Sequence, residues 1–184
     1  MFKRLLGLDP NPNQNVVDDL YEQIVAAARQ PALYADWQVP DTPLGRFEMI
    51  SLMLFLVLRR LRGEQGAAEA VGQDLVDTFF KEVEHSIREL GIGDAGVPKR
   101  MKKLARMFYG RTKSYGEALE ESDEAALAEA LRRNVQPATD DWPQAQQLAR
   151  YAAQIAQALA SQPLDALTKG VIAFPDAAPR GEAA

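Results

Sequence analysis

The sequence predicts an all-α fold, a single-domain helical bundle of about six helices. Three observations support this prediction. Apolar residues recur three and four positions apart in one segment after another, which is the spacing of a helix face. The chain has no internal repeat and no alternating apolar and polar run long enough for a sheet. Its 184 residues, 47% of them hydrophobic, suit one domain with a proper core.

The chain divides into three parts. We expect a short amphipathic N-terminal arm in residues 1–14 and the helical domain in residues 15–161. Residues 162–184 are rich in alanine, proline and glycine, and we expect an irregular, mobile C-terminal tail there. The arm has too few apolar residues for a signal peptide, whose apolar core needs roughly 7–15. The longest apolar run, residues 52–58, is far below the roughly 20 residues of a membrane span. We therefore expect a soluble, intracellular protein.

The first helices begin at recognisable residues. Asn15 is the expected cap of the first helix, and Pro31 ends that helix and can open a short one. Thr42 is the expected cap of the next helix, with Pro43 at its first position. This helix runs to about Arg62 and is apolar on nearly every side, so it must be buried or meet a partner.

Helical patterns continue through the second half of the chain. An apolar stripe marks a helix over residues 71–90, and Gly91 is its natural end. The next helix begins near residue 98 and runs to residue 110 or slightly beyond. Two further helices are expected over residues 122–133 and 140–161, each with acidic residues at its start.

Residues 91–96 contain a literal G-x-G-x-x-G pattern. This pattern binds dinucleotides where a strand delivers it to the start of a helix. Here Gly91 follows a helix, and Asp94 inside the pattern would repel a pyrophosphate. We therefore interpret the pattern as a corner in which the glycines turn the chain and Pro98 opens the next helix.

The composition excludes several kinds of site. The chain has no cysteine and one histidine, His85, so it can hold neither a thiol nucleophile nor a zinc site built on cysteine or paired histidine. His85 lies off the apolar stripe and is expected to face solvent. No acidic pair has a spacing that singles it out, although carboxylates for magnesium or calcium stay open. We expect no catalysis, no cofactor and no metal, and the net charge of -5 disfavours DNA as a partner.

A dense positive segment follows the glycine corner, with no acid between Ala95 and Gly116. Met101, Leu104 and Phe108 have the spacing of a core-facing stripe, which leaves the cations for the surface. Two interpretations stand side by side: a solvated face partly neutralised by the acids of residues 117–124, or a docking surface for phosphates or an acidic partner. The candidate basic face consists of Lys99, Arg100, Lys102, Lys103, Arg106 and Arg111.

Several segments resemble the ubiquinol–cytochrome c chaperone family. They are IVAAARQPALYADW, VPDTPLGRFEMISLMLFLVLRRLR, FFKEVEHSIRELGIGDAGVPKRMKKLARMFYGR and SYGEAL, in this order and spacing between Tyr21 and Leu119. The resemblance implies a non-enzymatic assembly chaperone for the respiratory bc1 complex. It further implies that the chain binds newly made cytochrome b, that it has a small partner protein, and that it associates with the ribosome. The chain is expected to be a bacterial-type member, located in the cytoplasm at the inner face of the membrane.

A chaperone of a membrane protein needs apolar surface to shelter its client. The candidate client-binding residues lie on the second and third long helices: Phe55, Leu56, Phe79 and Phe80. The alternative is that these residues are core, as a bundle of this size requires. Asp41 and Arg46 are expected to form a structural ion pair in the proline-rich loop. The alternative function is a membrane-surface or lipid-binding helical protein, whose N-terminal arm and basic helix contact anionic lipid.

Overall fold

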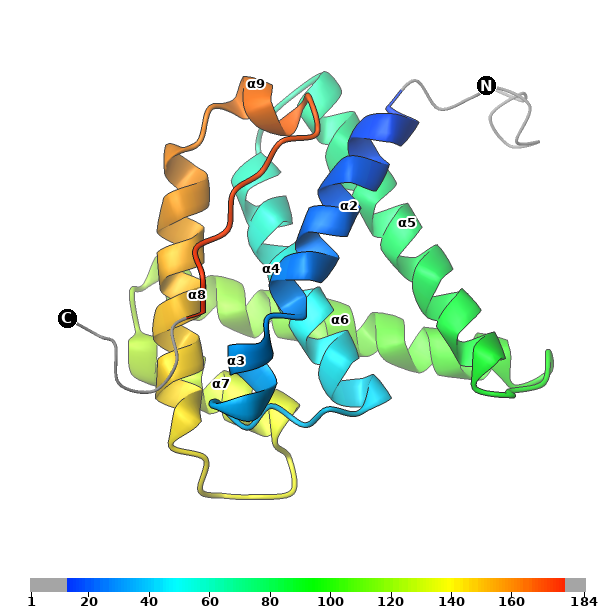
Figure 1. The fold of residues 1–184 in the computed structure, drawn as a ribbon, viewed down its shortest axis with the longest axis vertical. Coiled ribbons are helices and arrows are strands. Elements are labelled where there is room, and N and C mark those ends of the chain that lie inside the picture. The colour runs from blue at the N-terminus through cyan, green and yellow to red at the C-terminus, as the bar shows by residue number, and fades with distance from the viewer. Residues whose placement is uncertain (1–12, 178–184) are drawn as a thin grey trace.

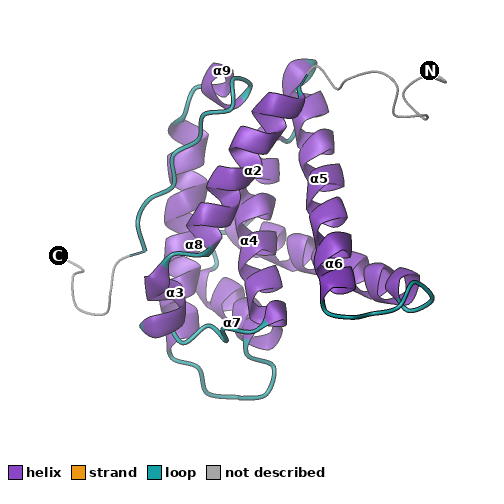
Figure 2. Cartoon of the chain, turned by 45° about the vertical axis from the view of Figure 1, so that its right-hand side comes forward, coloured by secondary structure: helices purple, strands orange, loops and turns teal. Residues whose placement is uncertain are grey.

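The computed structural model describes residues 13–177, and every regular element in that span is a helix (Figures 1 and 2). Six of the described helices have 12 to 24 residues and two are short. They are α2 (Gln14–Ala28), α3 (Pro31–Ala35), α4 (Pro43–Leu61), α5 (Ala67–Glu89), α6 (Val97–Glu120), α7 (Glu124–Val135), α8 (Gln144–Ser161) and α9 (Leu164–Leu167). The prediction of an all-α bundle of about six helices is confirmed. The predicted N-terminal arm lies outside the described residues, apart from residues 13 and 14.

Helix α4 forms the centre of the bundle, because α2, α5, α6, α7 and α8 all pack against it. Met49, Met53 and Leu54 are fully buried within it, as expected for a helix that is apolar all round. Its start matches the prediction: the Thr42 hydroxyl accepts a 3.1 Å hydrogen bond from the backbone N–H of Gly45, with a proline at the first helical position. Within the described part of the chain, no helix is both long and apolar enough to cross a bilayer.

The glycine pattern is a corner between two helices. Helix α5 ends at Glu89, Gly91 has φ +78°, and α6 begins at Val97. Asp94, which lies in the corner, pairs with Arg88 at the end of α5. Helix α6 continues to Glu120 instead of ending near residue 110, since packing of its later turns on the bundle outweighs the low helix propensity of Gly110.

Two helix starts differ from the predictions. The first helix is capped at Asn13, whose carbonyl accepts the N–H of Val17 at 2.9 Å, and Asn15 lies inside the helix. Helix α8 begins after Pro143 rather than at residues 140 and 141, because Thr139 holds that stretch in a separate turn through hydrogen bonds with Asp141. In contrast, the start of α7 is as expected.

The described part of the predicted C-terminal tail is packed on the core. After α9, residues 168–177 run between α2 and α8 in both ribbon views (Figures 1 and 2). Leu167, the last residue of α9, and Ile172 are buried. Local sequence patterns did not indicate this packing, because it depends on residues at the other end of the chain. Residues 178–184 lie outside the described residues.

Candidate functional site

Five cations project from the first half of α6 and line a shallow groove together with Gly96. They are Lys99, Arg100, Lys102, Lys103 and Arg106, and all five are exposed. We call this set the basic ridge. Within the described part of the chain, none of the five forms an ion pair. The ridge therefore presents positive charge that the protein itself leaves uncompensated.

The opposite face of α6 anchors the ridge to α5. Phe108 is buried against two aromatic rings of α5, with ring centroids 5.3 Å from Phe79 and 5.7 Å from Phe80. Met101 and Leu104 are half-buried on the same side. Such edge-to-face and tilted ring contacts stabilise beyond the area they bury. The ridge therefore lies on a packed helix.

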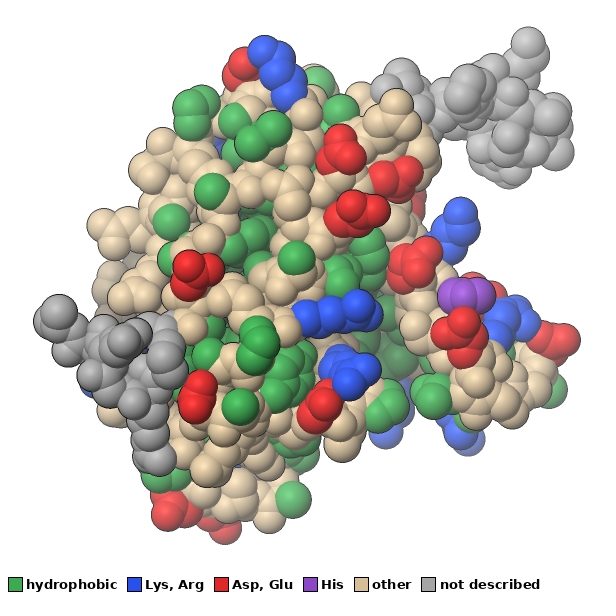
Figure 3. Space-filling view, viewed as in Figure 1, with side chains coloured by type: hydrophobic (Ala, Val, Ile, Leu, Met, Phe, Trp, Pro, Cys, Tyr) green, Lys and Arg blue, Asp and Glu red, His purple; other side chains and the backbone are tan. Residues whose placement is uncertain are grey.

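The acidic residues after the ridge are engaged elsewhere. Asp123 caps α7 by accepting the N–H of Ala126 at 2.9 Å. Three glutamates pair with cations that do not belong to the ridge: Glu117 with Lys113 at 3.8 Å, Glu120 with Arg62 at 3.3 Å, and Glu124 with Arg150 at 2.8 Å. The structure thus gives no support to neutralisation of the ridge by this cluster. Over α2 and α5, acidic side chains are prominent on the face shown in Figure 3.

The inclusion of Arg111 in the exposed basic face is wrong. Its side chain is 10% exposed, and its Nη2 lies 2.6 Å from Oε1 of Glu48 on α4. The physical reason is its position three residues after Phe108 and four before Tyr115, which places it on the buried stripe of α6. Sequence reasoning missed Glu48, although a single carboxylate inside an otherwise apolar helix was a usable signal.

The Glu48–Arg111 pair is a contact between two ionisable groups inside the core. Burial raises the pKa of the Glu48 carboxyl to about 8, and the Arg111 guanidinium opposes this rise. Several polar atoms of Glu48, Arg111 and neighbouring Ser51 have no hydrogen-bond partner among residues 13–177. The pair joins α4 to the middle of α6, so it helps to set where α6 lies on the bundle.

The structure places three of the four candidate client-binding residues in the core. Phe55, Leu56 and Phe79 are 7%, 1% and 1% exposed. The sequence of a helix that is apolar on every side does not indicate which of its faces remains exposed to solvent, so these residues could not be placed from sequence alone. Phe80 is half-buried, and its ring centroid lies 6.3 Å from that of Tyr109, which is 58% exposed. An aromatic contact thus leads from the core to the surface beside the ridge.

Two smaller predictions are confirmed. The Nε of Arg46 donates to Asp41 at 2.6 Å, and this hydrogen bond lowers the pKa of Asp41. His85 faces solvent with its side chain 65% exposed, 3.2 Å from Glu89. Neither contact involves the basic ridge.

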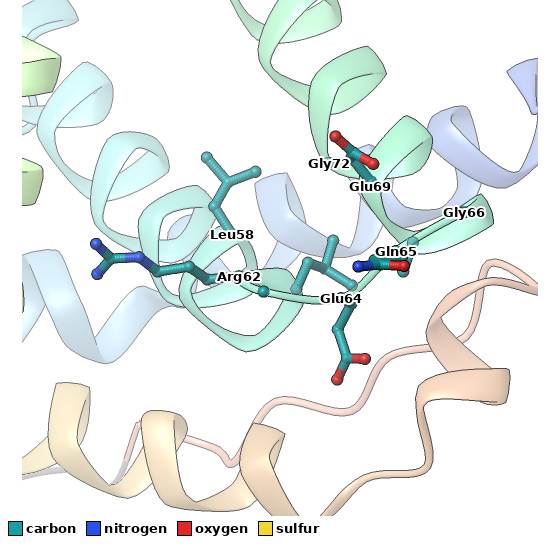
Figure 4. Close-up of a pocket in the computed structure, with 10 residues that line it drawn as sticks. Leu58, Arg62, Glu64, Gln65, Gly66, Glu69 and Gly72 are labelled. Atoms are coloured by element: carbon teal, nitrogen blue, oxygen red, sulfur yellow. The ribbon is translucent and has the colours of Figure 1, made fainter.

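A second depression lies at the turn between α4 and α5 (Figure 4). The side chains of Arg62, Glu64 and Glu69 point in different directions there, so they do not converge on one point. The described residues contain no group of three or more His, Cys, Asp or Glu that could hold a metal ion.

Comparisons with known proteins agree with one another. The family model described as ubiquinol-cytochrome C chaperone matches residues 35–174. A curated relative, ubiquinol-cytochrome-c reductase complex assembly factor 1 of Xenopus laevis, is 28% identical over 97 residues, which are 53% of this chain and 48% of that protein. The chain thus spans about half the length of this relative. The crystal structure of the Cbp3 homolog from Brucella abortus is 52% identical with a TM-score of 0.85, covering 96% of this chain and 98% of the other.

Proposed function

Because this chain belongs to the ubiquinol–cytochrome c chaperone family, we propose that it is a non-enzymatic assembly chaperone for the bc1 (ubiquinol–cytochrome c reductase) complex. It shelters an apolar segment of a membrane-protein client, for which cytochrome b is the expected candidate. It docks on its partner through the basic ridge. The description of the Xenopus relative as an assembly factor for this complex supports the proposal.

The observation that carries the docking role is the uncompensated charge of the ridge. Like charges three or four residues apart on a helix destabilise it by roughly 0.2–0.5 kcal/mol per pair. Lys99 and Lys103 have this spacing, as do Lys103 and Arg106. A negatively charged partner removes this cost, and the phosphates of ribosomal RNA or an acidic protein surface both supply the charge.

Charge reversal tests the docking role. In one variant Lys99, Lys103 and Arg106 are changed to Glu. A matched control makes the same change of net charge at exposed cations away from the ridge, Arg29, Lys81 and Arg133. Co-sedimentation with ribosomes and pull-down of newly made cytochrome b are measured over a salt series. The ridge variant is expected to lose binding while the control keeps it, and equal binding by both would remove the ridge from the mechanism.

The accessible part of the client surface is the aromatic pair beside the ridge. Tyr109 is exposed and contacts the half-buried Phe80, so an apolar segment can pack here without opening the core. A photo-crosslinking amino acid at position 109 is expected to capture newly made cytochrome b. The same probe at Val171, which is 59% exposed and follows α9 rather than lying on α6, is the control. Capture at both positions or at neither contradicts the assignment.

A second candidate function is attachment to an anionic membrane at the cytoplasmic face. The specific observation is Leu90, which is 61% exposed at the turn that leads into the ridge helix. An exposed aliphatic side chain near a row of cations is typical of proteins that lie on lipid headgroups. Flotation with vesicles containing phosphatidylserine is expected to carry the protein at low salt. Leu90→Ser and the ridge reversal should each weaken flotation, and recovery of the protein only at the bottom of the gradient would exclude this candidate.

A further inference from the structure

The basic ridge lies on a part of the molecule that extends beyond the main core. Helices α5 and α6 meet at the glycine corner, at the edge of the molecule away from α8 (Figures 1 and 2). Ile87 and Val97, on either side of this corner, are buried but do not belong to the core of the bundle. We call residues 84–106, which carry the ridge, the ridge arm. The direction of the arm is therefore set where it joins the bundle.

Two neighbouring residues of α4 hold the base of the ridge arm. Phe47 lies against Phe79 of α5, with ring centroids 5.7 Å apart, and Phe79 in turn contacts Phe108 of α6. Aromatic pairs are stable in several offset and edge-on arrangements, so these rings hold the arm without fixing its angle. Glu48 contacts Arg111 of α6 at 2.6 Å. This second contact is directional, because the donors of a guanidinium lie in a rigid planar fork.

The stretch of α6 that follows the arm has little else to hold it on the core. Among residues 109–114, Arg111 alone is buried. Gly110 adds no side chain, and the hydroxyls of Thr112 and Ser114 donate to carbonyls of their own helix at 2.9 Å and 3.2 Å. Glycine is a weak helix former, and such bonds from serine and threonine often bend helices. The stretch is therefore suited to bending, and its buried contact with the core is the pair with Glu48.

The Glu48–Arg111 pair is better suited to fixing a position than to adding stability. Oε2 of Glu48 and both Nε and Nη1 of Arg111 have no hydrogen-bond partner among residues 13–177. Burying ionisable groups costs solvation, which an incompletely bonded pair regains only in part. Replacement of a buried pair by apolar residues of similar volume is accordingly often neutral for stability. The best-attested use of such pairs is to select one packing arrangement over others.

We propose that Glu48 and Arg111 are positioning residues that fix the direction of the ridge arm relative to the bundle. Their contact holds α6 against α4 just after the arm, so the ridge faces one direction. Without the contact, α6 bends within residues 109–114 and the arm takes several directions. The inference rests on the proposed function only where it treats the ridge as a docking surface, because the direction of the arm is a property of the free protein.

The test measures the direction of the arm in the absence of any partner. The chain has no cysteine, so spin labels attach only at two introduced ones, Ser86→Cys on the arm and Gln154→Cys on α8. Glu48→Met combined with Arg111→Met, the core variant, removes the pair without leaving either group alone in the core. The distribution of label-to-label distances, from electron–electron double resonance, should broaden or shift by about 2 Å or more, the scale of helix shifts at packed interfaces. A distribution equal to that of the wild-type background overturns the proposal.

Two controls separate direction from general stability. Arg62 and Glu120, 3.3 Å apart, also join α4 to α6, but both side chains are exposed. Changing these two residues to Met should leave the arm distance unchanged. Labels at Glu22→Cys and Gln154→Cys both lie on the bundle and should report the same distance with and without the core variant. If the bundle distance broadens as much as the arm distance, the pair supports the whole fold and the proposal fails.

Gly110→Ala tests where the bend lies. A Cβ at this position meets nothing within 4 Å, so the substitution stiffens the helix without a new contact. Added to the core variant, it should narrow the arm distribution back toward that of the wild type. A purely structural role of the pair gives no reason for this rescue, and an unchanged width contradicts bending within residues 109–114.

A second measurement uses the wild type, whether or not the core variant folds. Hydrogen exchange should be at least about tenfold faster at the amides of residues 112–114 than at those of residues 104–108, since segments with few buried contacts open first. Equal protection along α6 contradicts the proposal. Ribosome co-sedimentation of the core variant then tests the consequence for docking, with all five ridge cations intact. A wild type that does not bind ribosomes refutes ribosome docking but leaves the distance result valid.

Discussion

Gly45 and Gly110 both lie inside helices, yet replacing each by alanine should change stability in opposite directions. By intrinsic propensity alone, Gly→Ala in a helix interior stabilises by about 1 kcal/mol. A Cβ on Gly110 meets nothing within 4 Å, so Gly110→Ala should show that gain. At Gly45 the added Cβ would lie 1.9 Å from the carbonyl oxygen of Pro40, far inside contact distance.

The cost at Gly45 can be worked from what must move. The carbonyl of Pro40 accepts the N–H of Thr42 at 2.9 Å, and Thr42 caps α4 through the N–H of Gly45. Moving the loop costs about 1–3 kcal/mol as overpacking, and losing the cap costs about 1 kcal/mol. After subtracting the propensity gain of about 1 kcal/mol, Gly45→Ala should destabilise by about 1–3 kcal/mol.

The assay is urea unfolding of the two variants and the wild type, followed by circular dichroism at 222 nm. Both variants bury similar surface, so their m-values should match that of the wild type and differences in midpoint report stability. The expected order is Gly110→Ala, wild type, Gly45→Ala, from most to least stable. If Gly45→Ala unfolds at the same urea concentration as Gly110→Ala, the close approach of the proline-rich loop to α4 is not a constraint on the fold.

Three further predictions concern the core and the ridge. Burial raises the pKa of Glu48 from its ordinary 4.5 to about 8, so the folded protein keeps this proton to a higher pH than the unfolded chain does. The contribution of Glu48 to the free energy of unfolding is therefore fully present below pH 4.5 and is lost as the pH rises toward 8. Arg111→Met removes the opposing cation, so urea unfolding at pH 5.5 and 8.0 should show a steeper loss of stability than in the wild type; equal slopes contradict this. Phe79→Ala removes a fully buried ring and should lower the free energy of unfolding in urea by about 3–5 kcal/mol. Phe80→Ala removes a half-buried ring and should cost roughly half as much. Equal losses in the two variants would contradict the difference in burial between the rings. If the ridge meets RNA, the logarithm of the binding constant should fall linearly with that of salt concentration. Lys103→Gln should reduce the magnitude of that slope by about 0.7–0.9, and an unchanged slope excludes a phosphate contact there.

Much of the fold was predictable because its signals are local. The Thr42 cap, the glycine corner and the start of α7 each depend on a few neighbouring residues, and the structure confirms them. The length of α6 was not predictable in this way. Gly110 is a weak helix former, and the helix continues because later residues such as Tyr115 are buried against the bundle.

In the candidate site, too, some features follow from local sequence and others depend on packing between helices. The cations of the ridge and the core-facing stripe beneath them belong to a single helix, so spacing alone placed them on opposite faces. Arg111 has the same charge and helix but lies on the stripe, and its partner Glu48 belongs to another element. The burial of Phe55, Leu56 and Phe79 depends likewise on what packs against α4 and α5.

By itself the sequence determined where the six long helices lie, the glycine corner and the location of the ridge cations, since these follow from contacts within one or two turns of chain. Tertiary structure decided which charges are compensated, which apolar faces stay open, and where residues 168–177 lie. Gln23 and Gln30 hydrogen-bond to a segment almost 150 residues further along the chain. Neither end of the chain has a local pattern that records this pairing, because the amide groups meet only after α2 and α8 have packed on α4.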